Sequence, residues 1–97
     1  MDTNNKENLN NILFAVNQVF FACHKEYLKD LEEIILIASL KNWTYEEIAE
    51  DIGYSKGYID DEGSKFWKKF SETIGEPISK KNLKGPIRRL MDKYQFL

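Results

Sequence analysis

The chain of 97 residues has few of the side chains on which catalytic and metal sites depend. Its single cysteine, Cys23, leaves no internal disulfide and no cysteine cluster for zinc. His24 is the single histidine, and adjacent helical residues point about 100° apart, so these two side chains do not form a nucleophile–base pair by themselves. We expect Cys23 to be buried and His24 to lie at the edge of the core. A glycine-rich phosphate loop is also missing. We therefore predict a non-enzymatic domain without a cofactor, a metal ion or a small-molecule substrate.

Long apolar runs are missing as well. No stretch approaches the about 18 apolar residues that a membrane span requires. The apolar region from Ile12 to Cys23 is interrupted by Asn17 and Gln18, and nothing near it resembles a signal-peptide cleavage site. We expect a cytoplasmic protein with no membrane contact.

The net charge of −2 is far from that of a strongly cationic nucleic-acid binder, but the charges are unevenly distributed. Residues 44–64 hold seven acids and one base, whereas residues 65–97 hold nine bases and three acids. Such an asymmetry should influence the choice of any partner.

The stretch 44–59, TYEEIAEDIGYSKGYI, has the residue order typical of a helix-turn-helix motif. Thr44 and Ser55 are predicted N-caps of its two helices, and Gly53 can take the left-handed conformation that ends the first helix. That first helix has one apolar stripe, formed by Tyr45, Ile48, Ala49 and Ile52. We expect Tyr58 and Ile59 to return to the core.

Apolar residues repeat at helical spacing along the rest of the chain. We expect a first helix from Asn8, a second from Lys29 or Asp30 to Lys41, one after the motif that ends at Gly75, and a last helix capped by Ser79. Pro86 either kinks the last helix or leaves two shorter ones, Lys80–Lys84 and Pro86–Gln95. No alternation of period two indicates a strand. The sequence thus predicts an all-α fold, a five-helix bundle with a helix-turn-helix of the LuxR or sigma-factor kind. We expect one domain over residues 1–97, with a disordered tail at 1–7 and a core at 8–95.

Three further residue types are informative. Trp43 lies between two apolar stripes and is predicted to anchor the core. Gly63 is predicted to break or kink the helix that follows the motif, because glycine weakens a helix interior. Phe14 and Phe21 lie off the stripe of the first helix, so this helix is either covered on two sides, which we favour, or meets a partner.

The second helix of the motif is the segment that reads the major groove in DNA-binding relatives. Tyr54, Ser55, Lys56 and Tyr58 are therefore candidates for DNA contact, with packing of the turn by the two tyrosines as the alternative. Three consecutive carboxylates follow in the same helix, Asp60, Asp61 and Glu62, and would be repelled by phosphates.

A basic patch is the second candidate site for nucleic acid. Its residues are Lys65, Lys68, Lys69, Lys80, Lys81, Lys84, Arg88 and Arg89. The alternatives are solvated helix faces, or pairing with the acidic motif within the domain or between two copies.

The chain resembles helix-turn-helix domains found at the N-termini of large bacterial, often cyanobacterial, signalling proteins, and described in the von Willebrand A and MoxR-associated conflict systems. The segments that carry the resemblance are Leu31-Glu32-Glu33, TYEEIAEDIGYSKGYI, GSKFWKK, Gly75-Glu76 and ISKKNL, within about residues 28–90. The resemblance implies an N-terminal module of a protein with STAND-type NTPase, WD-repeat or TIR domains downstream.

From these observations we favour an interaction or adaptor module that contacts a protein partner or a second copy of itself. Sequence-specific DNA binding by a transcriptional regulator is the alternative. The candidate contact residues in either case are Tyr54, Ser55, Lys56, Tyr58, Asp60 and Asp61.

Overall fold

The computed structural model describes the backbone of residues 5–94 and the side chains of residues 9–94. It consists of five helices, and no strand occurs within this range: α1 (Asn5–His24), α2 (Asp30–Leu40), α3 (Tyr45–Ile52), α4 (Lys56–Ile74) and α5 (Lys84–Tyr94). The predicted all-α, five-helix fold is confirmed. Helix α1 begins three residues before the expected start, and the rest of the predicted tail, residues 1–4, lies outside the described residues, as does Gln95 at the end of the predicted core.

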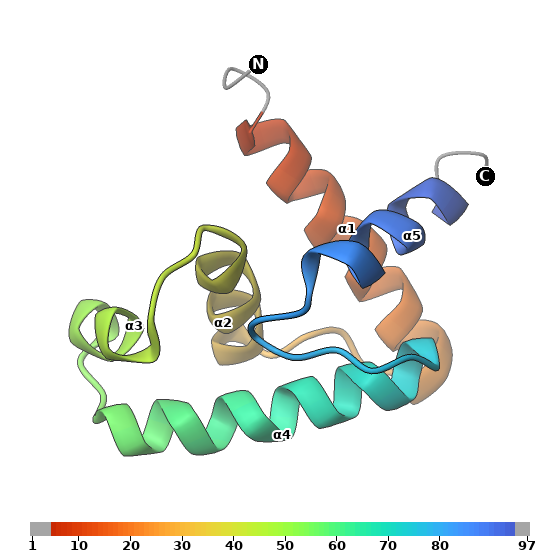
Figure 1. The fold of residues 1–97 in the computed structure, drawn as a ribbon. Helices are drawn as coiled ribbons and strands as arrows, with labels where there is room; N and C mark the ends of the chain where they lie inside the picture. The colour runs from red at the N-terminus through yellow and green to blue at the C-terminus, as the bar shows by residue number, and fades with distance from the viewer. Residues whose placement is uncertain (1–4, 95–97) are drawn as a thin grey trace.

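Helix α4 is the element against which α1, α2 and α3 pack. It runs along one side of the domain and contacts α3 near its N-terminal end and α1 and α2 further along, while α5 lies beside α1 (Figure 1). The interior of the domain is therefore built on the apolar side of α4. Two of its aromatic side chains there, Phe66 and Phe70, are almost completely buried and lie with ring centroids 5.5 Å apart.

The main core joins α1, α2, α4 and α5. Phe20 of α1 packs against Phe66 and Phe70 with centroid distances of 6.1 and 5.6 Å. Burial of each such ring stabilises the fold by about 1.5–3 kcal/mol relative to an exposed ring. Leu28, from the connection between α1 and α2, belongs to the same cluster, as does Ile78 after α4.

A smaller core holds the helix-turn-helix together. It consists of Ala38, Ile48, Ala49 and Ile59, with Trp43, Tyr45 and Ile52 packed against it. Trp43 was predicted to anchor the core, and it packs against this smaller core. Ala49 is 3% exposed, as a residue of the predicted apolar stripe of this helix.

Helix α4 continues through Gly63, so the predicted break at this residue is wrong. Gly63 is buried, and a Cβ atom there would lie 2.7 Å from the Cζ atom of Tyr45. The close approach of α3 to α4 explains the glycine. The packing gained at this contact outweighs the lower helix propensity of glycine, which costs about 1 kcal/mol relative to alanine.

The C-terminal segment differs from the prediction. Residues 79–82 form a turn, closed by the N–H of Asn82 donating to the carbonyl of Ser79 at 3.1 Å, and α5 begins at Lys84. Ser79 therefore does not cap the last helix, and 80–84 is not a helix. Pro86 lies in the first turn of α5, where a missing N–H costs no helical hydrogen bond.

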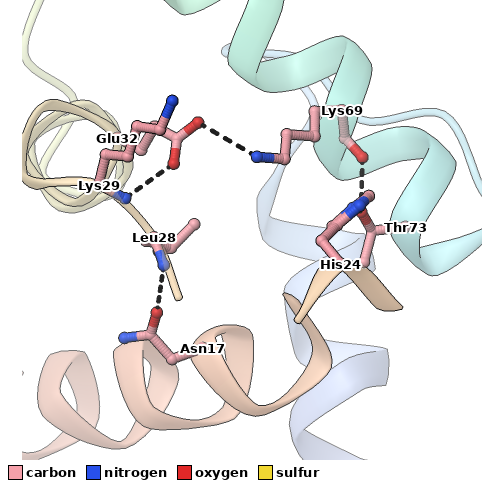
Figure 2. A network of polar contacts seen from close by, with 7 residues as sticks. All are labelled: Asn17, His24, Leu28, Lys29, Glu32, Lys69 and Thr73. Atoms are coloured by element: carbon pink, nitrogen blue, oxygen red, sulfur yellow. Dashed lines mark hydrogen bonds and ion pairs between the residues drawn. The ribbon is translucent and has the colours of Figure 1, made fainter. Parts of the chain in front are cut away.

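A chain of polar contacts fixes the connection between α1 and α2 (Figure 2). The Oδ1 atom of Asn17 accepts the N–H of Leu28 at 2.7 Å, and a carboxylate oxygen of Glu32 accepts the N–H of Lys29 at 2.8 Å. The other carboxylate oxygen of Glu32 lies 3.9 Å from Nζ of Lys69 on α4. The N–H groups of Leu28 and Lys29 have no helical acceptor in this connection, and Asn17 and Glu32 supply one for each.

His24, at the end of α1, links the same connection to α4. Its Nε2 atom lies 2.8 Å from Oγ1 of Thr73 (Figure 2). Because Thr73 donates its one hydroxyl proton to the carbonyl of Lys69 at 2.7 Å, His24 is the donor to Thr73 and carries its proton on Nε2. His24 is half-buried, as expected, whereas Cys23 is exposed and the prediction of a buried cysteine is wrong. Cys23 lies in the last turn of α1, with its side chain exposed among the described residues.

Candidate functional site

The turn of the helix-turn-helix has the geometry that the sequence predicted. Oγ1 of Thr44 accepts the N–H of Glu47 at 3.1 Å, and the Glu47 carboxylate accepts the N–H of Thr44 at 2.8 Å, which makes a reciprocal capping box. Gly53 ends α3 with a φ of 82°, in the left-handed region. Ser55 then caps α4 by accepting the N–H of Tyr58 at 3.1 Å.

Two tyrosines stand beside this turn. Tyr54 and Tyr58 are 52% and 43% exposed, and their ring centroids lie 4.9 Å apart. The expectation that Tyr58 returns to the core is wrong, since only Ile59 does so. Both rings therefore remain available for contact with a partner.

The three consecutive carboxylates of α4 do not form one acidic face, which corrects the sequence-based picture. Successive helical residues point about 100° apart. Asp60 turns back to Lys56, with Oδ2 2.9 Å from Nζ, and Glu62 lies 3.4 Å from Nζ of Lys65. The side chains of Asp60 and Glu62 are 38% and 31% exposed, so Asp61 is left as the open carboxylate of the three. The hydrogen bond with Asp60 raises the pKa of Lys56.

The acidic surface of the motif lies on α3 instead. Its charged residues are all acids and all exposed: Glu46, Glu47, Glu50 and Asp51. Glu47, Glu50 and Asp51 surround the Trp43 ring in a shallow hollow of about 350 Å³, and we call these three carboxylates the acidic face. In helix-turn-helix complexes with DNA this first helix crosses the phosphate backbone, which a row of carboxylates opposes.

The predicted basic patch does not assemble as one surface. Lys69 pairs with Glu32 and lies 5.5 Å from the centroid of the Phe20 ring, so it belongs to the structure of the core. Arg89 pairs with Glu76 at 2.7 Å, and this hydrogen bond lowers the pKa of Glu76. Lys65 is bound to Glu62 on the same helix. Lys68 and Arg88 are exposed on α4 and α5, apart from the last three members, Lys80, Lys81 and Lys84, which line one groove.

Four lysines converge elsewhere, in a groove of about 730 Å³ between the start of α3 and the 80–85 segment. We call it the lysine groove. Its basic residues are Lys56, Lys80, Lys81 and Lys84. Glu46 is the one acid among its lining residues. Lys56 was not expected to join the C-terminal lysines, because it is distant from them in sequence and only the packing of α3 and α4 brings it there.

Lys80 is the most constrained of the four. Its Nζ atom donates to the carbonyl oxygen of Trp43 and lies 5.5 Å from the centroid of the Tyr45 ring. Burial lowers the pKa of Lys80, although the negative charge of Glu47 partly offsets this. Among the described residues no carboxylate lies within ion-pair distance of it.

The outer side of α1 is the second surface of interest. Phe14 is 65% exposed and Phe21 is 41% exposed, so the expectation that this helix is covered on both sides is wrong within the domain. The Phe21 ring stacks on Tyr27 with a centroid distance of 4.7 Å. Gln18 is exposed between the two phenylalanines. We call Phe14, Gln18, Phe21 and Tyr27 the α1 face.

An open groove of about 1080 Å³ continues from Phe14 toward α5. It is lined mainly by apolar side chains, and its floor consists of Leu9, Ile12, Leu40, Ile87, Met91 and Tyr94. Lys41, Lys84 and Arg88 lie at its edge with Asp92. Hydrophobic spacing in α1 indicated Phe14 and Phe21 as unusual, but no sequence pattern located the groove beside them.

The two capped helices and their turn, packed on three further helices, define a helix-turn-helix domain. More narrowly, the chain belongs to the family of the vWA-MoxR associated protein N-terminal HTH, whose model matches residues 7–90. Comparisons with curated proteins and with solved structures give no match. Within residues 5–94, no helix is both long enough and apolar enough to cross a membrane.

Proposed function

We propose that this domain is a non-enzymatic protein-interaction module, the N-terminal adaptor of a cytoplasmic bacterial signalling or conflict-system protein that carries a STAND-type NTPase. The observation that carries this proposal is the α1 face. Phe14 and Phe21 are exposed on a helix that has no Asp, Glu, Lys or Arg between Glu7 and Lys25. Depletion of charge together with exposed aromatic rings is the compositional signature of a protein–protein interface.

The free energy of burying these rings supports the same interaction role. Phe14 and Phe21 are 65% and 41% exposed, so a partner that covered them would gain the part of the about 1.5–3 kcal/mol per ring that the domain leaves unused. Exposed apolar side chains gathered on one face of a domain often mark a binding site. The groove beside Phe14 would accept a side chain or a helix from that partner.

DNA recognition is the second candidate, and one observation favours it. Asp60 and Glu62 are turned toward lysines, so the exposed side of α4 presents Tyr58, Lys65 and Lys68 together with the carboxylates of Asp61 and Glu72. The four carboxylates of α3 argue against it, because they would lie where the phosphate backbone passes. We therefore place DNA second.

The test uses the full-length protein in its own cells. A photo-crosslinking amino acid replaces Phe14 in one version and the exposed Glu72 of α4 in a matched control. We expect defined protein adducts from position 14, fewer from position 72, and loss of the position 14 adducts when Phe21→Asp is added. Phe21→Asp should change the free energy of unfolding by no more than about 1 kcal/mol, since the ring is only partly buried.

A parallel titration of labelled DNA duplexes separates the two functions. The proposal expects weak binding that does not depend on sequence and disappears between about 50 and 200 mM salt. Sequence-dependent binding that persists at the higher salt concentration, together with no protein adducts at position 14, would replace the interaction role by DNA recognition.

A further inference from the structure

The lysine groove and the acidic face are complementary in charge and are present on the same molecule. Four lysines and a single glutamate line the groove, and three carboxylates without a base form the acidic face. Within the domain, the ion pairs of these residues are limited to that of Lys56 with Asp60, as far as residues 9–94 are described. Most of the charge on both surfaces is therefore uncompensated.

The groove also has features that favour an incoming carboxylate. Lys80 is partly removed from water without an ion-pair partner, and an anion beside it would restore the stabilisation that burial removed. Ser39 lines the same groove at 3% exposure, and its buried Oγ atom has no hydrogen-bond partner among the described residues. Asn42 and Asn82 add amide donors at the rim.

We infer that the lysine groove binds the acidic face of a second copy of this chain, so that Glu50 and Asp51 of one copy contact Lys81 and Lys84 of the other. This inference rests on the proposed interaction role and specifies one partner for it. The contact joins two different surfaces, so each copy can offer both. Depending on the rotation between neighbours, such contacts close into a ring or continue as a filament.

The docking uses a different surface from the α1 face. Phe14 lines the apolar groove between α1 and α5, whereas Lys80 and Lys81 line only the lysine groove, and Lys84 stands between the two. Phe21 and Tyr27 line neither groove, so we expect a copy seated in the lysine groove to leave them open. Self-association and recruitment of another protein through α1 can then occur in one assembly.

The experiment is sedimentation of the 97-residue chain at several concentrations up to about 1 mM, an affinity range in which weak surface contacts are detected. We use Lys81→Glu/Lys84→Glu for the groove and Glu50→Lys/Asp51→Lys for the acidic face. All four residues are exposed and none caps a helix, so the variants are expected to fold. Lys65→Glu/Lys68→Glu makes the same charge change on α4, outside the lysine groove, and is the control.

We expect concentration-dependent association of the unaltered chain that weakens at least about tenfold between 50 and 300 mM salt, as screening of exposed charges requires. Each test variant should be monomeric alone, the control should associate as the parent does, and an equimolar mixture of the two test variants should form a complex again. The mixture is the decisive measurement. Each variant keeps one unaltered surface, so association returns only if the acidic face of one copy binds the lysine groove of the other.

A parent chain that remains monomeric at about 1 mM in 50 mM salt overturns the inference, as does association that both test variants retain. In either case, adducts from position 14 would still support the interaction role. Conversely, restored association in the mixture without adducts at position 14 would uphold the docking and reject the α1 face as the binding surface.

Discussion

Gly63 of α4 lies directly against the phenol ring of Tyr45 of α3, so closely that a Cβ atom at position 63 would be 2.7 and 2.8 Å from two ring carbons. The ring has little freedom to move away. Nε1 of Trp67 donates to its oxygen at 2.8 Å, and Lys80 lies over its face. This contact sets the distance between the two helices of the helix-turn-helix.

Gly63→Ala should therefore destabilise the domain by about 1–3 kcal/mol, because overpacking at the helix crossing exceeds the gain in helix propensity. Gly57→Ala is the matched control. It lies in the same helix with nothing within 4 Å of the added methyl group, and it should be neutral or stabilising by up to about 1 kcal/mol. Urea denaturation measures both, and equal stability of the two variants would contradict the close packing.

Asn17→Ala should cost about 1–3 kcal/mol, because it leaves the N–H of Leu28 without its acceptor in a partly buried turn (Figure 2). Gln18→Ala, at the exposed neighbouring position, should stay within about 0.5 kcal/mol of the parent chain. Thermal or chemical denaturation distinguishes them. If both variants match the parent, the turn between α1 and α2 is not fixed by this hydrogen bond.

Cys23 should react with a thiol reagent in the folded protein at a rate within about tenfold of that in denaturant, because its side chain is exposed. The rate of colour release from an aromatic disulfide reagent measures this, with Cys23→Ser as the blank. A thiol that reacts only after denaturation would show instead that α1 is covered on this side.

The stability of the domain should fall at alkaline pH because of Tyr45. Burial raises the pKa of its phenol above the ordinary 10.0, the hydrogen bond from Trp67 lowers it, and the charge of Asp60 raises it. Because folding raises this pKa, the protonated phenol contributes in full to the free energy of unfolding below pH 10.0. That contribution is lost as the pH rises through the pKa of the folded protein.

The check is the difference in unfolding free energy between the parent chain and Tyr45→Phe as a function of pH. This difference should be constant up to about pH 9 and then decrease, and subtraction removes the contribution of other alkaline groups, Lys80 included. An ultraviolet titration difference between the two proteins should show the Tyr45 step above 10.0. A step at or below that value would mean that the phenol is hydrated in the folded protein.

The helices and the turn of the motif followed from local information. Thr44, Gly53 and Ser55 act on backbone groups within three or four residues of themselves, so their roles can be predicted from neighbouring sequence alone. The apolar faces of α2 and α5 were predictable for the same reason, since helical periodicity places their residues on one side. The start of α5 was missed because the 79–82 turn forms where Ile78 and Leu83 are held in the core by other helices.

The surfaces that matter for function were decided by tertiary structure. The pairs of Asp60 with Lys56 and of Glu62 with Lys65 are local, since they join residues four and three apart in one helix, and helical spacing could have predicted them. Sequence spacing could not show that Lys56 joins Lys80, or that Phe14 stays exposed in the described part of the chain. Each depends on where a distant element packs, and many residues of the chain separate the groups concerned. Local sequence determined that this chain forms a capped helix-turn-helix, because caps and periodicity act within one helical turn. The lysine groove followed only from tertiary packing, because the fit of α3 against α4 at Gly63 and Tyr45 is what places Lys56 beside the 80–84 segment. The exposure of Phe14 and Phe21 likewise depends on how the other helices pack on α1.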